Sequence, residues 1–154
     1  MATEYELDLS TSMKPTQALE LISRRISGLA LTWNGKNSDY LLGPTIEIDV
    51  SEPFGSWQET IKDGFRFVPN LVVGFRFKNN TDFNISSQVM FQATMRLLEH
   101  AEDAVLLFNS EIIVLQRLGG QLILNSDHHL WDDDWLKSRL ARPIERRPLP
   151  SPLL

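Results

Sequence analysis

One short segment gathers most of the side chains that could carry out chemistry. Residues 126–135 read SDHHLWDDDW and contain two adjacent histidines and four aspartates. Imidazole and carboxylate groups are common ligands of zinc and other divalent ions, and a bound ion can activate water for hydrolysis. The segment therefore raises a metal-dependent hydrolase as one alternative, with these candidate ligands: His128, His129, Asp132 and Asp133.

The spacing within this segment favours a simpler interpretation. In a helix each histidine would lie four residues before an aspartate, but adjacent histidines would point in different directions. The segment also lacks the spacing of an established metal motif such as H-E-x-x-H. A solvated loop whose aspartates cap a short helix explains the same residues, with Trp131 and Trp135 anchoring that helix on the sheet. We therefore expect no catalytic residue, no cofactor and no metal ligand here.

Other signatures of catalysis are weak. Cysteine is absent, which leaves no thiolate nucleophile and no zinc–thiolate site. No G-x-S-x-G nucleophile elbow occurs, and Gly35-Lys36 belongs to a predicted hairpin rather than to a phosphate-binding loop. His100 is predicted near the C-terminus of a long helix, where the helix dipole favours a protonated imidazole. The sequence thus contains no recognisable reaction centre.

A second set of carboxylates lies on the outward side of two predicted strands. Glu4, Glu6 and Asp8 alternate with apolar residues in the first strand, as do Glu47 and Asp49 in a later one. Paired carboxylates catalyse glycoside hydrolysis, but this requires a cleft and one raised pKa, neither of which the sequence shows. A solvated sheet face is the simpler interpretation. Docking of a basic partner is the alternative use of the same face.

Hydrophobic periodicity indicates which elements position these residues. Apolar residues four apart predict a helix that begins near Pro15 and ends before Gly28, and a longer one over 83–101. Alternation predicts strands, and turn residues at 34–37 and at Gly119-Gly120 predict two tight hairpins. We expect a loop with one or two helical turns near 57–62 and a short helix over 132–140. The predicted strands cover 5–9, 29–33, 40–42, 46–50, 71–77 (preceded by 65–67), 104–109, 112–117 and 121–125.

This order of elements predicts an α+β fold. We expect a largely antiparallel sheet of about six to seven strands, two main helices packed on one face, a short C-terminal helix and a proline-rich tail. Residues 1–141 are predicted to form a single domain, and residues 142–154 an extended tail rich in arginine and proline. A chain of 154 residues can bury a sizeable core without disulfides.

Charge and composition restrict the partners. The net charge of −5 argues against nucleic acid, whose binding needs a basic face, and permits a basic protein partner. No apolar run approaches the ~20 residues that span a membrane, so we expect no membrane partner. The absence of cysteine and of a visible secretory signal favours the cytoplasm. The residues predicted to bind a partner are Asp127, Trp131, Asp132, Asp133 and Asp134.

Four segments spread over most of the chain are similar to one known family. They are EYELDLST (4–11), GFRFVPNLVVGFRF (64–77), HAEDAVLLFNSEIIVLQRLGGQLILNSD (100–127) and RRPLPSPLL (146–154). In their hydrophobic pattern and their turns, these segments resemble the swarming-inhibition (Sit) immunity proteins of bacterial contact-dependent toxin systems. The resemblance implies a cytoplasmic, non-enzymatic protein that binds and neutralises a cognate toxin. It implies no particular contact residues, and SDHHLWDDDW matches no pattern of the family.

A third alternative is a structural one. The chain could associate with itself through the strand predicted at 71–77 or through its tail, and the sequence leaves the oligomeric state open. The sequence thus leads to three hypotheses about function, namely a toxin-binding immunity protein, a metal-dependent hydrolase and a self-associating module.

Overall fold

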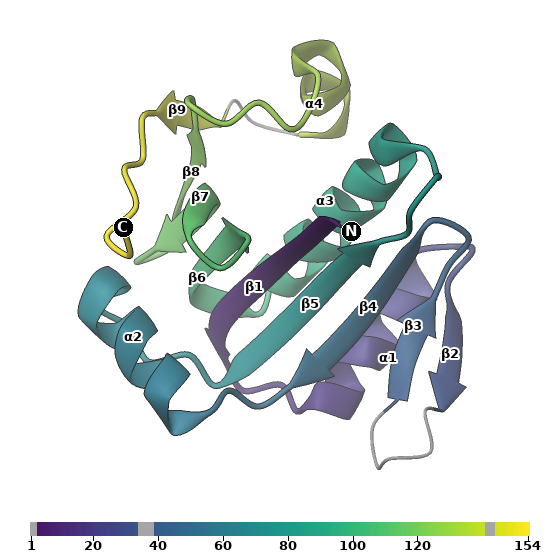
Figure 1. Ribbon diagram of the computed structural model, residues 1–154, viewed down its shortest axis with the longest axis horizontal. Coiled ribbons are helices and arrows are strands. Elements are labelled where there is room, and N and C mark those ends of the chain that lie inside the picture. Colours follow the sequence, from purple (N-terminus) through teal and green to yellow (C-terminus); the bar gives the residue numbers. More distant parts are fainter. Residues whose placement is uncertain (1–2, 34–38, 141–143) are drawn as a thin grey trace.

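The computed structural model describes residues 3–33, 39–140 and 144–154, and within them one twisted sheet organises the chain. The sheet has nine strands in the order β2-β3-β4-β5-β1-β6-β7-β8-β9. All neighbouring strands are antiparallel except β8 and β9. Figure 1 shows β1 near the middle of this sheet, with the N-terminal hairpin strands on one side and the later strands on the other.

The elements follow one another along the chain in this order: β1 (Thr3–Thr11), α1 (Pro15–Arg25), β2 (Ala30–Trp33), β3 (Asp39–Leu42), β4 (Ile46–Ser51), α2 (Gly55–Phe65), β5 (Leu71–Phe77), α3 (Phe83–Leu98), β6 (Ala101–Phe108), β7 (Ile112–Leu118), β8 (Gln121–Asn125), α4 (Asp133–Arg139) and β9 (Glu145–Arg147). The α+β class and the largely antiparallel sheet are confirmed. The predicted count of six to seven strands was too low.

Helices α1 and α3 cover one face of the sheet, as expected for the two main helices. They lie behind the sheet in Figure 1 and pack on each other and on the strands. Residues Leu7 and Leu9 of β1 point into this layer and are completely buried, as is Ile22 of α1. The main core therefore lies between this helix pair and the sheet.

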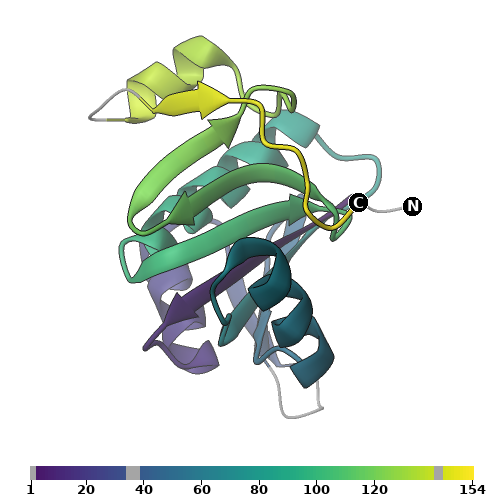
Figure 2. The same cartoon turned by 90° about the vertical axis from the view of Figure 1, so that its left-hand side faces the viewer.

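Helix α2 covers part of the opposite face and is longer than the one or two helical turns that the sequence predicted near 57–62. Ile61 and Phe65 of this 11-residue helix pack on Val105 and Leu107 of β6, and Leu149 of the tail joins the same cluster. Figure 2 shows α2 in front of the sheet, with the C-terminal segment running down beside it. Pro53, Gly55 and Gly64 had indicated a loop, but burial of one apolar stripe outweighs the weak helix propensity.

Phe65 and Phe67 do not form the strand predicted before β5. Phe65 ends α2, and Arg66 then adopts a left-handed conformation, with φ of 66°, that closes the helix. This turn lets the rings of Phe65 and Phe67 both join the apolar cluster that α2 forms with β6. Tertiary burial rather than alternation therefore determines this segment.

The turn of one predicted hairpin can be compared with the structure, and the turn of the other cannot. Leu118 pairs with Gln121, and Gly119 and Gly120 between them have φ of 58° and 81°, as a tight hairpin turn requires. Strands β2 and β3 pair as expected, but their predicted Asn-Gly turn at 34–37 lies outside the described residues.

The C-terminal segment closes the fold beside α3 and β8. Helix α4 confirms the predicted short helix, and β9 pairs in parallel with β8, which was not expected of the tail. The rings of Trp131 and Trp135 both meet the buried ring of Phe91 edge-on, with centroids 4.9 and 5.2 Å away. The tryptophans therefore anchor α4 on helix α3 and not on the sheet.

Replacing Phe91 tests this anchoring. We expect Phe91→Ala to lower the free energy of unfolding by about 3–5 kcal/mol, because it leaves a cavity beneath both tryptophans. Chemical denaturation followed by tryptophan fluorescence measures the change. Phe54→Ala is the control, since Phe54 is 84% exposed, and it should shift stability by no more than about 0.5 kcal/mol. A loss below about 1 kcal/mol in Phe91→Ala would contradict the anchoring role.

Candidate functional site

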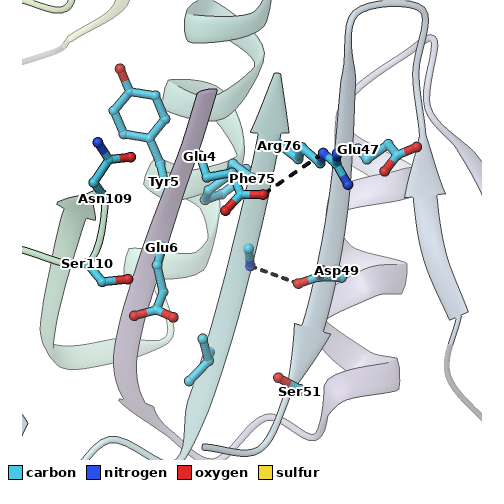
Figure 3. Close-up of a pocket in the computed structure, with 12 residues that line it drawn as sticks. Glu4, Tyr5, Glu6, Glu47, Asp49, Ser51, Phe75, Arg76, Asn109 and Ser110 are labelled. Atoms are coloured by element: carbon cyan, nitrogen blue, oxygen red, sulfur yellow. Dashed lines mark hydrogen bonds and ion pairs between the residues drawn. The ribbon is translucent and has the colours of Figure 1, made fainter. Parts of the chain in front are cut away.

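The part of the sheet that α2 leaves uncovered carries a hollow of about 340 Å³. Strands β1, β5 and β4 form its floor, and Asn109 and Ser110 of the β6–β7 turn stand at its rim. Four carboxylates surround it, two from β1 and two from β4 (Figure 3). We call this site the acidic hollow, and its carboxylates are Glu4, Glu6, Glu47 and Asp49.

Strand register places these carboxylates in cross-strand rows. In the first row Arg76 of β5 lies between Glu4 and Glu47. The Arg76 Nε lies 3.9 Å from the Glu4 carboxylate, and both side chains are more than half exposed. Such an exposed pair contributes at most about 1 kcal/mol. Arg76 thus partly balances the two glutamates of its own row.

The second row contains no cation. Gly74 of β5 lies between Glu6 and Asp49, and its N–H donates to the Asp49 carboxylate over 3.2 Å. A Cβ at Gly74 would collide with the Asp49 Oδ1, so glycine is needed for this close approach. The Asp49 carboxylate therefore lies over the Gly74 backbone, in the space that a side chain would fill, with Glu6 on the other side, and we call this place the notch.

The electrostatics of the hollow favour a cation in this notch. Loss of hydration raises the pKa of Asp49, and the charges of Glu4 and Glu47 raise it further, against the opposing Gly74 hydrogen bond. Loss of hydration also raises the pKa of Glu6, against a hydrogen bond with Asp8 that lowers it, and the charge of Asp49 raises it further. Each carboxylate is thus destabilised by its neighbours, and a positive group placed between them would relieve that repulsion.

Burial increases along β1 toward α2. Glu4 is exposed, Glu6 is partly buried, and Asp8 is completely buried beneath the α2 helix. The indole Nε1 of Trp57 donates to the Asp8 Oδ1 over 2.7 Å. Desolvation, the charge of Glu6 and a hydrogen bond with Glu6 together raise the pKa of Asp8 to about 9. Asp8 is therefore protonated at neutral pH, and the charge of the face lies with the four carboxylates of the hollow.

The Glu6–Asp8 pair is poorly placed for acid–base catalysis. A general acid must lie within hydrogen-bonding reach of its substrate. Asp8 has the raised pKa but is completely covered by Trp57 and its surroundings, while Glu6 lines the hollow. The arrangement fits binding of a positive group better than glycoside hydrolysis.

The histidine–aspartate segment is used in structural contacts. Asp132 caps α4 by accepting from the Trp135 N–H at 3.1 Å, as its position predicts. Asp133 pairs with Arg146 at 2.5 Å, and the indole of Trp131 donates to the Ser87 carbonyl at 2.9 Å. No hydrogen bond or ion pair of the Asp127 and Asp134 carboxylates is found within the described ranges.

The structure does not bring together the residues considered as alternative metal ligands, which are His128, His129, Asp132 and Asp133. Among residues 3–33, 39–140 and 144–154, no three histidine, aspartate or glutamate side chains come close enough to share an ion. His128 instead lies against the Phe108 ring, with centroids 5.8 Å apart. Burial and the neighbouring His129 lower its pKa. The segment thus functions here as the start of a helix.

Several residues of the hollow escaped sequence reasoning. The outward carboxylates of β1 and β4 were identified, but Gly74 and Arg76 of the hollow were not, nor was Trp57, which covers Asp8 beside it. The spacing of Trp57, Ile61 and Phe65, four residues apart, was the signal for α2. No local signal marks Gly74 as a notch, because both flanking carboxylates come from other strands.

Comparison with known proteins identifies one match. The model of a family described as SitI3-like matches residues 3–135 of the chain. No curated protein and no solved structure matches it. The matched range contains every residue of the acidic hollow. No helix in the described part of the chain is long and apolar enough to cross a membrane.

The buried Asp8 predicts a specific pH dependence. The folded chain keeps this proton up to about pH 9, whereas the unfolded chain releases it near the ordinary value of 3.8. The folded state therefore binds more protons between these limits, and its stability falls as pH rises. Asp8→Asn cannot ionise but keeps the acceptor for Trp57 and a donor toward Glu6. We expect its stability advantage over the native chain to grow by up to about 1.4 kcal/mol per pH unit in this interval.

Urea denaturation at several pH values between about 5 and 8 measures the free energy of unfolding of Asp8→Asn and of the native chain, and their difference is compared across this range. Asp134→Asn is the control, because it removes an exposed carboxylate. Parallel stability profiles for Asp8→Asn and the native chain would show that Asp8 is ionised in the folded protein.

Proposed function

Because the chain belongs to the SitI3-like family, we propose that it is a non-enzymatic bacterial immunity protein that binds and neutralises a cognate toxin in the cytoplasm. The family match over residues 3–135 is the observation that carries this proposal. The open acidic hollow supports it, since an inhibitor requires a preformed surface and no reaction centre.

The acidic hollow is the proposed docking surface, and the partner surface is basic. Only Arg76 offers a positive charge among the residues that line it, against four carboxylates. The notch between Glu6 and Asp49 is suited to a lysine or arginine side chain of the toxin, whose charge would meet both carboxylates. A fit of this kind favours fast association and makes the affinity sensitive to salt.

The start of α4 is a second candidate surface, as the sequence predicted. Its candidate residues remain Asp127, Trp131, Asp132, Asp133 and Asp134. Three of them already have partners within the chain, in the contacts described above. Binding a toxin through them would mean breaking or sharing those contacts, so the acidic hollow is the better supported surface.

The two other readings have less support. The hydrolase alternative requires a bound metal ion, and the described residues contain no group of three histidine, aspartate or glutamate side chains that could hold one. The self-association alternative invoked the strand at 71–77 or the tail. β5 pairs with β1 on one side and β4 on the other, so it offers no free edge, whereas β9 of the tail is the last strand of the sheet and pairs only with β8 among the described residues. The oligomeric state itself stays open.

Co-expression tests the immunity role. The product of the open reading frame next to the gene of this chain is expressed in cells with and without this chain, and growth is recorded together with capture of that product on the immobilised protein. We expect growth to be restored and the toxin to be captured. Absence of both protection and binding would refute the immunity role.

Removing one carboxylate tests the docking surface. Asp49→Asn keeps the shape of the side chain and its acceptor for the Gly74 N–H, but removes the charge beside the notch. We expect toxin affinity to fall by about tenfold or more, since a hydrogen bond to a charged group contributes about 1.5–3 kcal/mol. Isothermal titration calorimetry measures the dissociation constant.

Asp134→Asn is the matched control, because it removes the same charge from an exposed position on α4. Its affinity should match that of the native chain. If the pair Asp133→Lys and Asp134→Lys weakens binding while Asp49→Asn does not, the start of α4 is the docking surface.

A further inference from the structure

A second pocket lies on the helical side of the molecule and has the opposite charge. Its volume is about 440 Å³, and it lies where the C-terminal ends of α1, α3 and α4 approach β7. Four arginines line it, one from each of these elements. We call it the arginine pocket, after Arg25, Arg96, Arg117 and Arg139.

Three of these arginines have no carboxylate partner in the described part of the chain. Arg96 pairs with Glu99 at 3.2 Å, whereas Arg25, Arg117 and Arg139 enter no ion pair within the described ranges. Arg139 instead lies 5.5 Å from the centroid of the Trp135 ring. In a protein whose net charge is −5, this local excess of positive charge is unusual.

Helix dipoles account for only part of this charge. Each helix C-terminus carries roughly half a negative charge, so three ends offset about one and a half of the four guanidinium charges. Glu99 offsets one more. The pocket therefore keeps a net positive charge of about one and a half.

Arg117 holds an unsatisfied donor in this pocket. Its NH1 donates to the Leu98 carbonyl over 3.0 Å and so caps the end of α3. Its Nε is buried and donates to no acceptor in the described part of the chain. An unsatisfied buried donor of this kind costs about 1–3 kcal/mol, so a bound anion that drew the guanidinium toward the pocket would recover part of that cost.

The walls of the pocket are partly apolar. Met95 of α3 and Leu140 line it and are partly exposed, while the side chains of Phe91 and Ile26 at its wall are buried. Pockets that hold small molecules combine such walls with a few convergent polar groups, and range from about 300 to 1,000 Å³. Guanidinium groups from several directions suit the three acceptor oxygens of a phosphate better than a single carboxylate.

We propose that the arginine pocket binds a small phosphomonoester with an aromatic or otherwise apolar body. Arg25, Arg96, Arg117 and Arg139 hold the phosphate, and the body of the ligand packs on Met95 and Leu140. This site is separate from the acidic hollow and does not depend on the immunity role.

Titration calorimetry with phenyl phosphate tests the site on the intact chain. We expect saturable binding of one molecule per chain, weaker binding of inorganic phosphate, and none of phenol, because both the charge and the ring contribute. Arg25→Gln should weaken phenyl phosphate binding by about tenfold, as loss of a charged hydrogen bond predicts. Arg117→Gln should do so as well, with thermal unfolding used to confirm that it folds.

Arg24→Gln is the matched control, because it removes the same charge from the adjacent residue, which pairs with Glu20 and does not line the pocket. It should leave the dissociation constant unchanged. The proposal is wrong if phenyl phosphate does not bind saturably, or if Arg24→Gln weakens binding as much as Arg25→Gln does.

Discussion

The alternation of β1 is the constraint on which the rest of the structure depends. β1 is hydrogen-bonded to β5 on one side and to β6 on the other, so its register is determined along both edges. Leu7 and Leu9 must face the helices α1 and α3, and a shift of one residue would place carboxylates in that core. The same register forces Glu4, Glu6 and Asp8 onto the opposite face, in rows with β5 and β4. The acidic hollow is thus a direct consequence of core packing on the other side of one strand.

The opposite face is divided into a covered part and an open part. Over β6 and β7 it is apolar and is closed by α2 and the tail, and at that boundary Asp8 is buried in its protonated form beneath Trp57. Over β1, β5 and β4 it is open and negative, with the notch at Gly74. Carboxylates that repel one another on a rigid sheet are prearranged for a basic partner, so little of the binding free energy is lost in ordering the site. The helical side carries its excess positive charge at converging helix ends, so the two surfaces would attract different ligands.

Local patterns in the sequence predicted the elements that depend on local physics. The alternation in β1, the four-residue spacing in α3 and the Gly119-Gly120 turn all correspond to elements of the structure. The family resemblance was confirmed by the match over residues 3–135. Helix α2 was predicted only as one or two helical turns within a loop, because Gly55 and Gly64 concealed the extent of its apolar spacing, and its stability comes from tertiary burial. The carboxylates of the hollow were recognised, but not their grouping. Glu6 and Asp49 lie far apart in the chain. They come into one row only because both of their strands pair with β5, where Gly74 lies between them.

In the proposed function, the acidic hollow is the surface that the toxin covers. Carboxyl-group footprinting tests it most directly, because modification of each aspartate and glutamate is followed by mass spectrometry with and without bound toxin. The account predicts that Glu4, Glu47 and Asp49 lose reactivity in the complex, while Asp133, Asp134 and Glu99 keep theirs. Protection of Asp133 and Asp134, with unchanged reactivity at Glu47 and Asp49, would contradict it.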